Sequence, residues 1–248
     1  MKILHRDALT QGGFAGLKEH RLIKDPIAFG PEANNDGSWP GLGNFVYLAD
    51  ARFMPHGETR MHNHMEIDVI SVMVEGSIAH QGSMGHGQDL HANDVQVQRA
   101  GGEGFSHNEV NPDDKLNRMI QLWILPEKKG QAASYKLQAT SYKLQATSYK
   151  LQATSYKVYQ PAKGKLTLIY GGTDSTENSF PANTHIGIAL LDAGQTIEIP
   201  TTFIAYLTRG TGIANNENIQ DGDLLRGRNL QFRAATDSQL ITIHNSDH

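Results

Sequence analysis

Apolar residues recur along the chain in short runs, and many of these runs alternate with polar residues at a period of two. This period is typical of β-strands, because successive side chains point to opposite faces of a sheet. Gly, Asn and Asp separate the runs, as expected for turns. The pattern predicts strands at residues 43–49, 67–74, 77–80, 95–98, 119–125, 165–170, 186–191, 196–199, 203–208, 230–233 and 240–244.

The predicted strands form two groups, one in each half of the chain, and both groups consist of short strands. Many short strands at close spacing are typical of a β-sandwich or barrel, so we expect an all-β protein with two β domains in tandem. Convincing helical periodicity is hard to find, and residues 6–19 are expected to form a short turn or arm. The expected domains are residues 1–133 and 158–248.

A perfect repeat separates the two groups. The unit Ser-Tyr-Lys-Leu-Gln-Ala-Thr occurs three times from Ser134 to Thr154, and residues 155–157 begin a fourth copy. The apolar spacing does not match a coiled-coil seam, and an odd period reverses the facing of a strand from one copy to the next. Removing residues 137–157 would leave an ordinary connecting strand. We therefore interpret residues 134–157 as an inserted linker, natural or engineered, that is mobile or loosely extended; a protruding β-ribbon or a swapped arm is the alternative.

Composition excludes several classes of function. The formal net charge is −4 and no Lys/Arg block occurs, so nothing suggests a nucleic-acid-binding face. The absence of cysteine excludes disulfides, cysteine zinc sites and thiol catalysis. No signal peptide is visible at the start, and no apolar run reaches the ~18 residues of a membrane span. We expect a cytoplasmic protein with neither a nucleic-acid partner nor a membrane partner.

Two clusters place good metal ligands at positions i and i+2: His62 with His64, and His107 with Glu109. On a β-strand these positions share a face. Two neighbouring strands could therefore aim all four side chains at one point. Three imidazoles and one carboxylate suit a divalent transition metal, iron above all, with one or two positions left for water or substrate. The spacing predicts a metalloenzyme.

Residues beside these clusters have both a structural and a functional interpretation. If strand alternation continues beyond His64, Glu66 and Asp68 share its face and could orient a metal ligand or exchange protons with substrate. A solvated carboxylate near the barrel mouth is the equal alternative. Trp123 is expected in the core rather than in a pocket.

The remaining histidines are assigned structural roles. His80, His86 and His91 are expected to be exposed turn residues, with a second metal cluster as the weaker alternative. His185 and His244 have no ligand at i+2, so the second domain is expected to be metal-free and structural. Neither a nucleophile elbow nor a phosphate-binding loop occurs.

Residues 57–126 resemble the pirin family of two-cupin proteins. His62-Asn63-His64, followed twelve residues later by Gly76, resembles the first cupin motif, and residues 104–107 resemble the second. Four further segments match the pirin pattern: residues 74–85, 93–96, 100–109 and 121–126. The resemblance implies two tandem cupin barrels, each a jelly roll or double-stranded β-helix. This chain departs from the family at Asn63, where proline is common, and at residues 66–68, where Gly-Phe-Glu is usual.

The resemblance also implies a function. The family's ligand pairs fall on His62 and His64 and on His107 and Glu109, which usually hold iron; Ni, Mn, Cu and Zn are the alternatives to Fe²⁺. It implies quercetin 2,3-dioxygenase-like cleavage of a flavonol ring with O₂ and release of carbon monoxide. The substrates would be a small aromatic polyphenol and O₂, and Glu109 would be catalytic as a fourth ligand able to take a proton.

Two alternatives remain open at this point. Relatives of this family also act as non-enzymatic regulators, in which bound iron senses redox state and a protein partner is bound. Cupin barrels also host isomerases and hydrolases with other metals, and a fold alone does not decide the chemistry.

Overall fold

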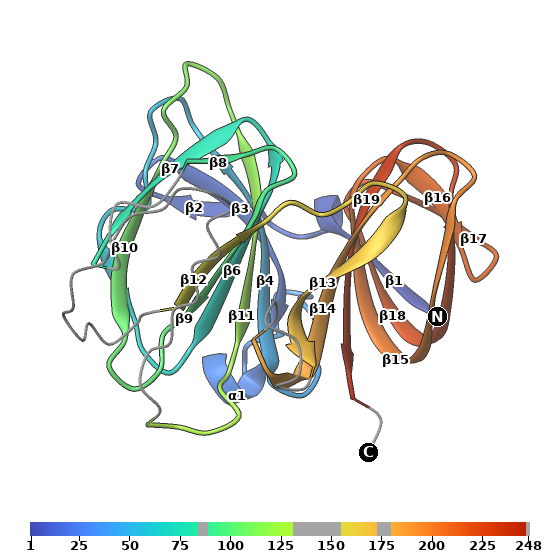
Figure 1. The fold of residues 1–248 in the computed structure, drawn as a ribbon, viewed down its shortest axis with the longest axis horizontal. Coiled ribbons are helices and arrows are strands. Elements are labelled where there is room, and N and C mark those ends of the chain that lie inside the picture. Colours follow the sequence, from blue (N-terminus) through green and yellow to red (C-terminus); the bar gives the residue numbers. More distant parts are fainter. Residues whose placement is uncertain (84–88, 131–154, 173–179, 247–248) are drawn as a thin grey trace, which may run out of the picture.

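The computed structural model describes residues 1–83, 89–130, 155–172 and 180–246. Within them the protein consists of two β-barrels that lie side by side (Figure 1). The prediction of an all-β fold with two tandem barrels is confirmed. None of the helices in the described ranges is long and apolar enough to cross a bilayer.

The N-terminal barrel has two sheets. The seven-stranded sheet has the order β12-β9-β6-β11-β4-β3-β2 and the four-stranded sheet the order β5-β10-β7-β8. The strands of the larger sheet are β2 (Gly12–Phe14), β3 (Leu17–Lys24), β4 (Phe45–Phe53), β6 (Asp68–Glu75), β9 (Val95–Arg99), β11 (Arg118–Ile124) and β12 (Ser155–Tyr159). Those of the smaller sheet are β5 (His62–His64), β7 (Ser77–Gly82), β8 (Leu90–His91) and β10 (Phe105–Val110).

Two short helices belong to the N-terminal segment. One is a 3₁₀ turn, η1 (Arg6–Ala8), and the other is the single turn α1 (Pro26–Phe29). Asp25 caps α1 by accepting a hydrogen bond from the backbone N–H of Ile27, and Pro26 occupies the first turn, where its missing N–H costs nothing. β3 lies partly within residues 6–19, where the sequence predicts only a turn or arm.

The C-terminal barrel is one eight-stranded sheet in the order β13-β14-β19-β15-β18-β16-β17, with β1 paired to β18. Its strands are β1 (Lys2–His5), β13 (Lys165–Gly172), β14 (Ala182–Leu191), β15 (Thr196–Arg209), β16 (Thr211–Ala214), β17 (Glu217–Gln220), β18 (Asp223–Ala234) and β19 (Ser238–Asn245). The two strands predicted at residues 196–199 and 203–208 are one strand, β15, whose register shifts against β18 between Ile199 and Thr202.

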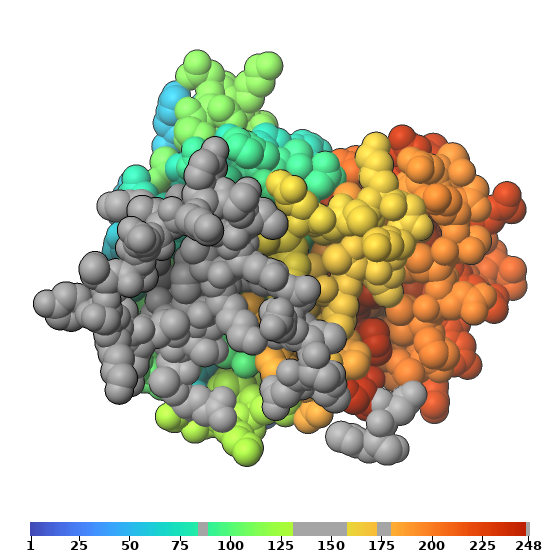
Figure 2. Space-filling model, in the orientation of Figure 1, coloured from blue at the N-terminus to red at the C-terminus, as the bar shows by residue number. Residues whose placement is uncertain are grey.

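Two strands pair across the expected division between the domains. β1 begins the chain yet pairs with β18 of the C-terminal barrel, and β12 follows the repeat yet pairs with β9 of the N-terminal barrel. Figure 2 shows the segment after β12, in yellow, lying between the two barrels on that face. Residues 134–154 of the expected linker lie outside the described residues, whereas its last three residues belong to β12. The domain boundaries at 133 and 158 stay a prediction.

The largest hydrophobic cluster lies between the barrels. On β6, Ile70 and Val72 belong to this cluster together with Tyr206 and Ile241 of the other barrel. The intervening residues of β6 point into the N-terminal barrel, so that the strand is buried on both faces and reads as a nearly continuous apolar run. The C-terminal barrel has its own apolar filling of fourteen buried residues, including Phe203, Leu225 and Phe232.

A buried ionic cluster accompanies this apolar contact. Arg118 on β11 has a fully buried side chain and donates to Asp50 at 2.5 and 2.9 Å, to Asp221 at 2.8 Å and to the carbonyl oxygen of Thr208 at 2.8 Å. Tyr206 donates to Asp50 at 2.5 Å. Burial alone would raise the pKa of Asp50, but the hydrogen bonds and charge of Arg118 bring it below its usual value. The cluster joins β11 and β4 of one barrel to β15 and the β17–β18 turn of the other.

Replacing Arg118 tests this cluster. Arg118→Leu leaves Asp50 buried without its main partner, so the free energy of unfolding in a urea titration should fall by about 3–5 kcal/mol. Arg52→Leu is the matched control, because the Arg52–Glu75 pair is largely exposed and should contribute less than about 1 kcal/mol. Adding Asp50→Asn to Arg118→Leu should recover part of the loss; equal losses in the two single Arg variants would contradict this account.

Candidate metal and substrate site

A cavity of about 430 Å³ opens into the N-terminal barrel. It lies against strands of both sheets and against α1, and its volume is in the usual range for a small-molecule site. The lining residues are Phe14, Leu17, Glu19, Arg21, Phe29, Tyr47, Ala51, Phe53, Thr59, His62, Asn63, His64, Met65, Ile67, Glu109, Met119, Gln121 and Trp123.

Three of the four predicted metal ligands meet beside this cavity, which His62 and His64 line. β10 pairs with β5 so that His107 stands opposite His62 and Phe105 opposite His64. The Nε2 atom of His107 lies 3.0 Å from Nε2 of His62 and 3.1 Å from Nε2 of His64. The ligand atoms of the three histidines all lie within 4.8 Å of one another. The i, i+2 spacing therefore brings the three imidazoles together.

The protonation of these rings fits a shared cation. His62 donates from Nδ1 to the carbonyl oxygen of Arg60 at 2.9 Å, which leaves the lone pair of its Nε2 facing the other two rings. Burial and the neighbouring His62 lower the pKa of His64 to about 4, and burial together with the other three histidines around it lowers the pKa of His107 further. Neutral imidazoles are the form that ligates metals. One proton cannot satisfy three converging lone pairs, whereas one divalent cation can.

Glu109 lies in the same cavity but has other partners in this structure. Its side chain is fully buried, Ser71 donates to its Oε1 at 3.1 Å, and Gln121 donates to its Oε2 at 3.3 Å. Burial raises the pKa of Glu109 to about 7, although both hydrogen bonds favour the ionised form. The carboxyl group is thus poised to exchange a proton near neutral pH. Its role as a fourth ligand stays a prediction.

Aromatic rings form one wall of the cavity. Tyr47 stacks on Trp123 with ring centroids 4.3 Å apart, and Phe29 stacks on Tyr47 at 5.4 Å. Trp123 in turn meets His64 edge-on at 5.5 Å. The expectation that Trp123 belongs to the core is wrong, because β11 turns its odd-numbered side chains toward the cavity. α1 contributes Phe29, which the strand pattern does not reveal.

The two carboxylates that the sequence offers as possible neighbours of the metal have other partners in this structure. Glu66 has a φ of 54°, which breaks the strand alternation after His64, and its Oε1 accepts from the N–H of Gly130 at 2.7 Å. Asp68 faces the barrel contact, where Arg99 donates to it at 2.9 Å and Tyr170 at 2.7 Å. In this structure Asp68 therefore takes part in the contact between the barrels.

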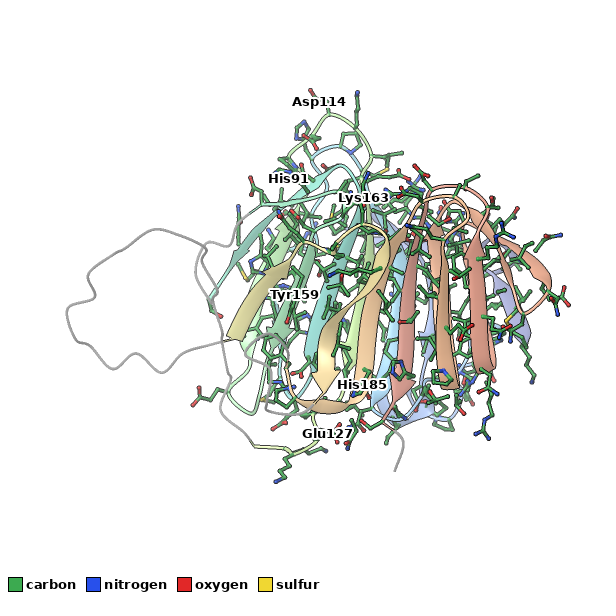
Figure 3. All side chains as sticks on the ribbon, turned by 45° about the vertical axis from the view of Figure 1, so that its right-hand side comes forward. His91, Asp114, Glu127, Tyr159, Lys163 and His185 are labelled. Atoms are coloured by element: carbon green, nitrogen blue, oxygen red, sulfur yellow. The ribbon has the colours of Figure 1, made fainter. Side chains whose placement is uncertain are left out.

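The other histidines differ from one another in burial. His80 is only 3% exposed and its Nε2 lies 3.1 Å from Nδ1 of His107, so the prediction of an exposed turn residue is wrong for it. His91 is exposed, as Figure 3 shows near one end of the N-terminal barrel, and His86 lies outside the described residues. In the C-terminal barrel the rings of His185 and His244 are 5.1 Å apart. That this barrel is metal-free stays a prediction.

Comparisons with known proteins agree with this architecture. Residues 37–124 match the family model described as Pirin. A Zymomonas mobilis protein named after quercetin 2,3-dioxygenase is 26% identical over 203 residues, which cover 78% of this chain and 79% of that protein. Quercetin 2,3-dioxygenase from Escherichia coli is 34% identical over 77 residues, but these cover only 30% of this chain and 32% of the enzyme.

The fold is also similar to a solved structure. The bacterial pirin YhhW from Escherichia coli, crystallised in complex with nickel(II), superposes with a TM-score of 0.75 at 16% identity. The superposition covers 98% of this chain and 97% of that chain. The prediction of two cupin barrels is confirmed by this likeness, which concerns the fold alone.

The raised pKa of Glu109 predicts a pH-dependent effect of Glu109→Gln on the metal-free protein. The unfolded carboxyl group titrates near 4.5 and the folded one near 7, so stability is lost as pH rises between these values. The loss above pH 7 is about 3 kcal/mol. In urea titrations with EDTA, the variant should therefore be more stable than wild type by about 3 kcal/mol at pH 8, and by less than about 1 kcal/mol at pH 5.

The control for this measurement is Glu103→Gln, which neutralises an exposed carboxylate close to the site. It should change stability by a similar small amount at both pH values. A difference between wild type and Glu109→Gln that is the same at pH 5 and pH 8 would contradict the assignment.

Proposed function

We propose, because residues 37–124 match the Pirin family model, that the N-terminal barrel is a metal-dependent dioxygenase that cleaves a flavonol-like polyphenol with O₂ and releases carbon monoxide. The observation that carries the proposal is the convergence of three Nε2 atoms at a cavity with an aromatic wall. The names of the relatives support the same reaction class.

The metal would be held by His62, His64 and His107, with Glu109 as the fourth ligand. A set of imidazoles with one carboxylate and open positions suits Fe²⁺, our first choice, while Ni, Mn, Cu and Zn are the alternatives. When bound, the metal would polarise a substrate hydroxyl group and supply the redox chemistry for O₂. The nickel(II) complex of the structural relative supports a metal of this series.

The cavity suits a flat, largely apolar substrate. The stacked rings of Phe29, Tyr47 and Trp123 offer a planar surface to an aromatic ring. Phe29 is also 38% exposed, so the apolar wall continues to the mouth. At the same wall, Arg21 donates to the buried Glu19 at 2.7 Å, and the hydroxyl of Tyr47 donates to Glu19 at 3.2 Å. This polar group would hydrogen-bond to phenolic hydroxyl groups at the end of the substrate.

Glu109 would accept the proton that a substrate hydroxyl group loses in the reaction. Burial raises the pKa of Glu109 to about 7 in the metal-free barrel, so the carboxylate would accept the proton of a substrate hydroxyl group once it is released from the metal. Gln121 and Ser71 then hold the carboxyl group in place, and Trp123 donates to Gln121 at 3.2 Å. The same chain of hydrogen bonds therefore links the aromatic wall to the proton acceptor.

Aerobic turnover of quercetin by the iron-loaded protein tests the proposal, with flavonol absorbance and carbon monoxide release as readouts. His62→Ala and His107→Ala should lose metal and activity together. Glu109→Gln should retain metal but lose most of its turnover, by about 10²-fold or more for a positioned acid–base group. His91→Ala, which changes an exposed histidine of the same barrel, should behave as wild type.

The alternatives predict different results. Metal binding by the wild type with no turnover of quercetin or related flavonols would overturn the enzymatic proposal and favour a redox-sensing regulator that binds a protein partner. Unchanged turnover in Glu109→Gln would show that Glu109 is not the proton acceptor, and it would not contradict metal binding by the three histidines.

Phe29→Ala tests the aromatic wall. Loss of one stacked ring should raise KM for quercetin by about 5–10-fold, equivalent to ~1–1.5 kcal/mol, with kcat nearly unchanged, because the contact would serve the ground state and the transition state equally. Ile27→Ala is the matched control, since Ile27 is 74% exposed on the same helix and does not line the cavity. Equal KM values for the two variants would contradict stacking on this wall.

A further inference from the structure

His80 occupies a position that the metal site proposed above does not use. It lies on β7, which pairs with β10 so that His80 stands opposite Glu109. Its side chain is buried behind His107, on the far side from the other two imidazoles, and its Nε2 lies 3.1 Å from Nδ1 of His107. The contact therefore joins His80 to the nitrogen of His107 that faces away from the candidate metal position.

Gln98 determines the direction of this hydrogen bond. Gln98 is fully buried on β9, and its amide nitrogen lies 3.2 Å from the same Nε2 atom of His80. In the orientation that this structure assigns to the Gln98 amide, its N–H group donates to His80, so Nε2 of His80 carries no proton and shares its one lone pair between Gln98 and His107. Since this atom accepts, the proton between the two imidazoles belongs to Nδ1 of His107.

The tautomer of His107 follows from this chain. A neutral imidazole carries one N–H group. With its proton on Nδ1, His107 presents an unprotonated Nε2 to His62 and His64, at 3.0 and 3.1 Å. With the opposite tautomer, an N–H group would point at the place where a cation must bind. The direction of one hydrogen bond therefore decides whether His107 can be a ligand.

We propose that Gln98 and His80 form a hydrogen-bond relay that holds His107 in the tautomer required for metal binding. Both are positioning residues, because neither touches the candidate metal position. Partners of this kind orient the ligand and raise its basicity, and their loss typically weakens metal binding by about 10–100-fold. The inference rests on the metal centre of the proposed function but is independent of the flavonol reaction.

The tautomer can be read directly. Long-range ¹H–¹⁵N correlation spectra of the metal-free protein, labelled with ¹⁵N-histidine, should show the proton of His107 on Nδ1 and that of His80 on Nδ1. In Gln98→Leu, Nε2 of His80 loses its donor, and the spectra should show a mixture of tautomers for both rings. A wild-type His107 protonated on Nε2, or spectra unchanged by Gln98→Leu, would overturn the relay.

Metal affinity supplies the second test. Co²⁺ titrations followed by the visible absorption of the bound ion should give a dissociation constant about 10–100-fold higher for His80→Phe than for wild type. His80→Gln, whose Oε1 can accept from His107, should stay within a few-fold of wild type. His91→Phe makes the same replacement at an exposed position and should leave the affinity unchanged. Equal affinities for His80→Phe and His91→Phe would overturn the proposal.

Two further measurements keep the test decisive. Circular dichroism and thermal unfolding establish that each variant is folded; if His80→Phe does not fold, Gln98→Leu takes its place and should weaken Co²⁺ binding by ~10-fold. If the wild type binds no Co²⁺, the metal centre of the proposed function fails, and the tautomer spectra alone decide the relay.

Discussion

The structure depends on the burial of both faces of the large N-terminal sheet. One face packs against the C-terminal barrel through the largest hydrophobic cluster of the described residues, and the other lines the interior of its own barrel. The ion cluster around Arg118 adds directional contacts to the apolar ones at the same interface. β1 begins the chain but adds to the sheet of the C-terminal barrel, and β12 follows the repeat but adds to the large sheet of the N-terminal barrel. The two barrels therefore form one folded unit.

This arrangement explains why the two barrel interiors differ. The C-terminal barrel has an interior cluster of apolar side chains that includes Phe203 and Phe232. The N-terminal barrel instead buries His64, His80 and His107 together with Glu109, although polar groups are costly to bury. Hydrogen bonds within the interior offset part of this cost. The strands that line this interior are also stabilised on their outer face by the apolar contact with the C-terminal barrel. The interior can therefore hold polar side chains around a cavity.

Strand periodicity predicted much of the fold and part of the site. The i, i+2 spacing correctly brought His62, His64 and His107 together, because β5 and β10 are regular and pair directly. The same rule failed for Asp68, because β5 ends at His64 and Asp68 begins β6 in the other sheet, after a turn in which Glu66 has a positive φ. The burial of His80 could not be predicted either, since it depends on β7 lying between β10 and β8, a long-range pairing. The contribution of Phe29 depends on a one-turn helix that is too short to show a period.

Alternate side chains of β11 serve two different places, the contact between the barrels and the cavity. Ile120 and Leu122 face the other barrel and belong to the large cluster, whereas Gln121 and Trp123 face the cavity. A change on the cavity side can therefore alter the aromatic wall, or the hydrogen bond from Gln121 to Glu109, without disturbing the contact between the barrels. Changes on the cavity side of β11 therefore leave the apolar contact on its outer face in place, while the imidazoles on β5 and β10 keep their positions in the smaller sheet.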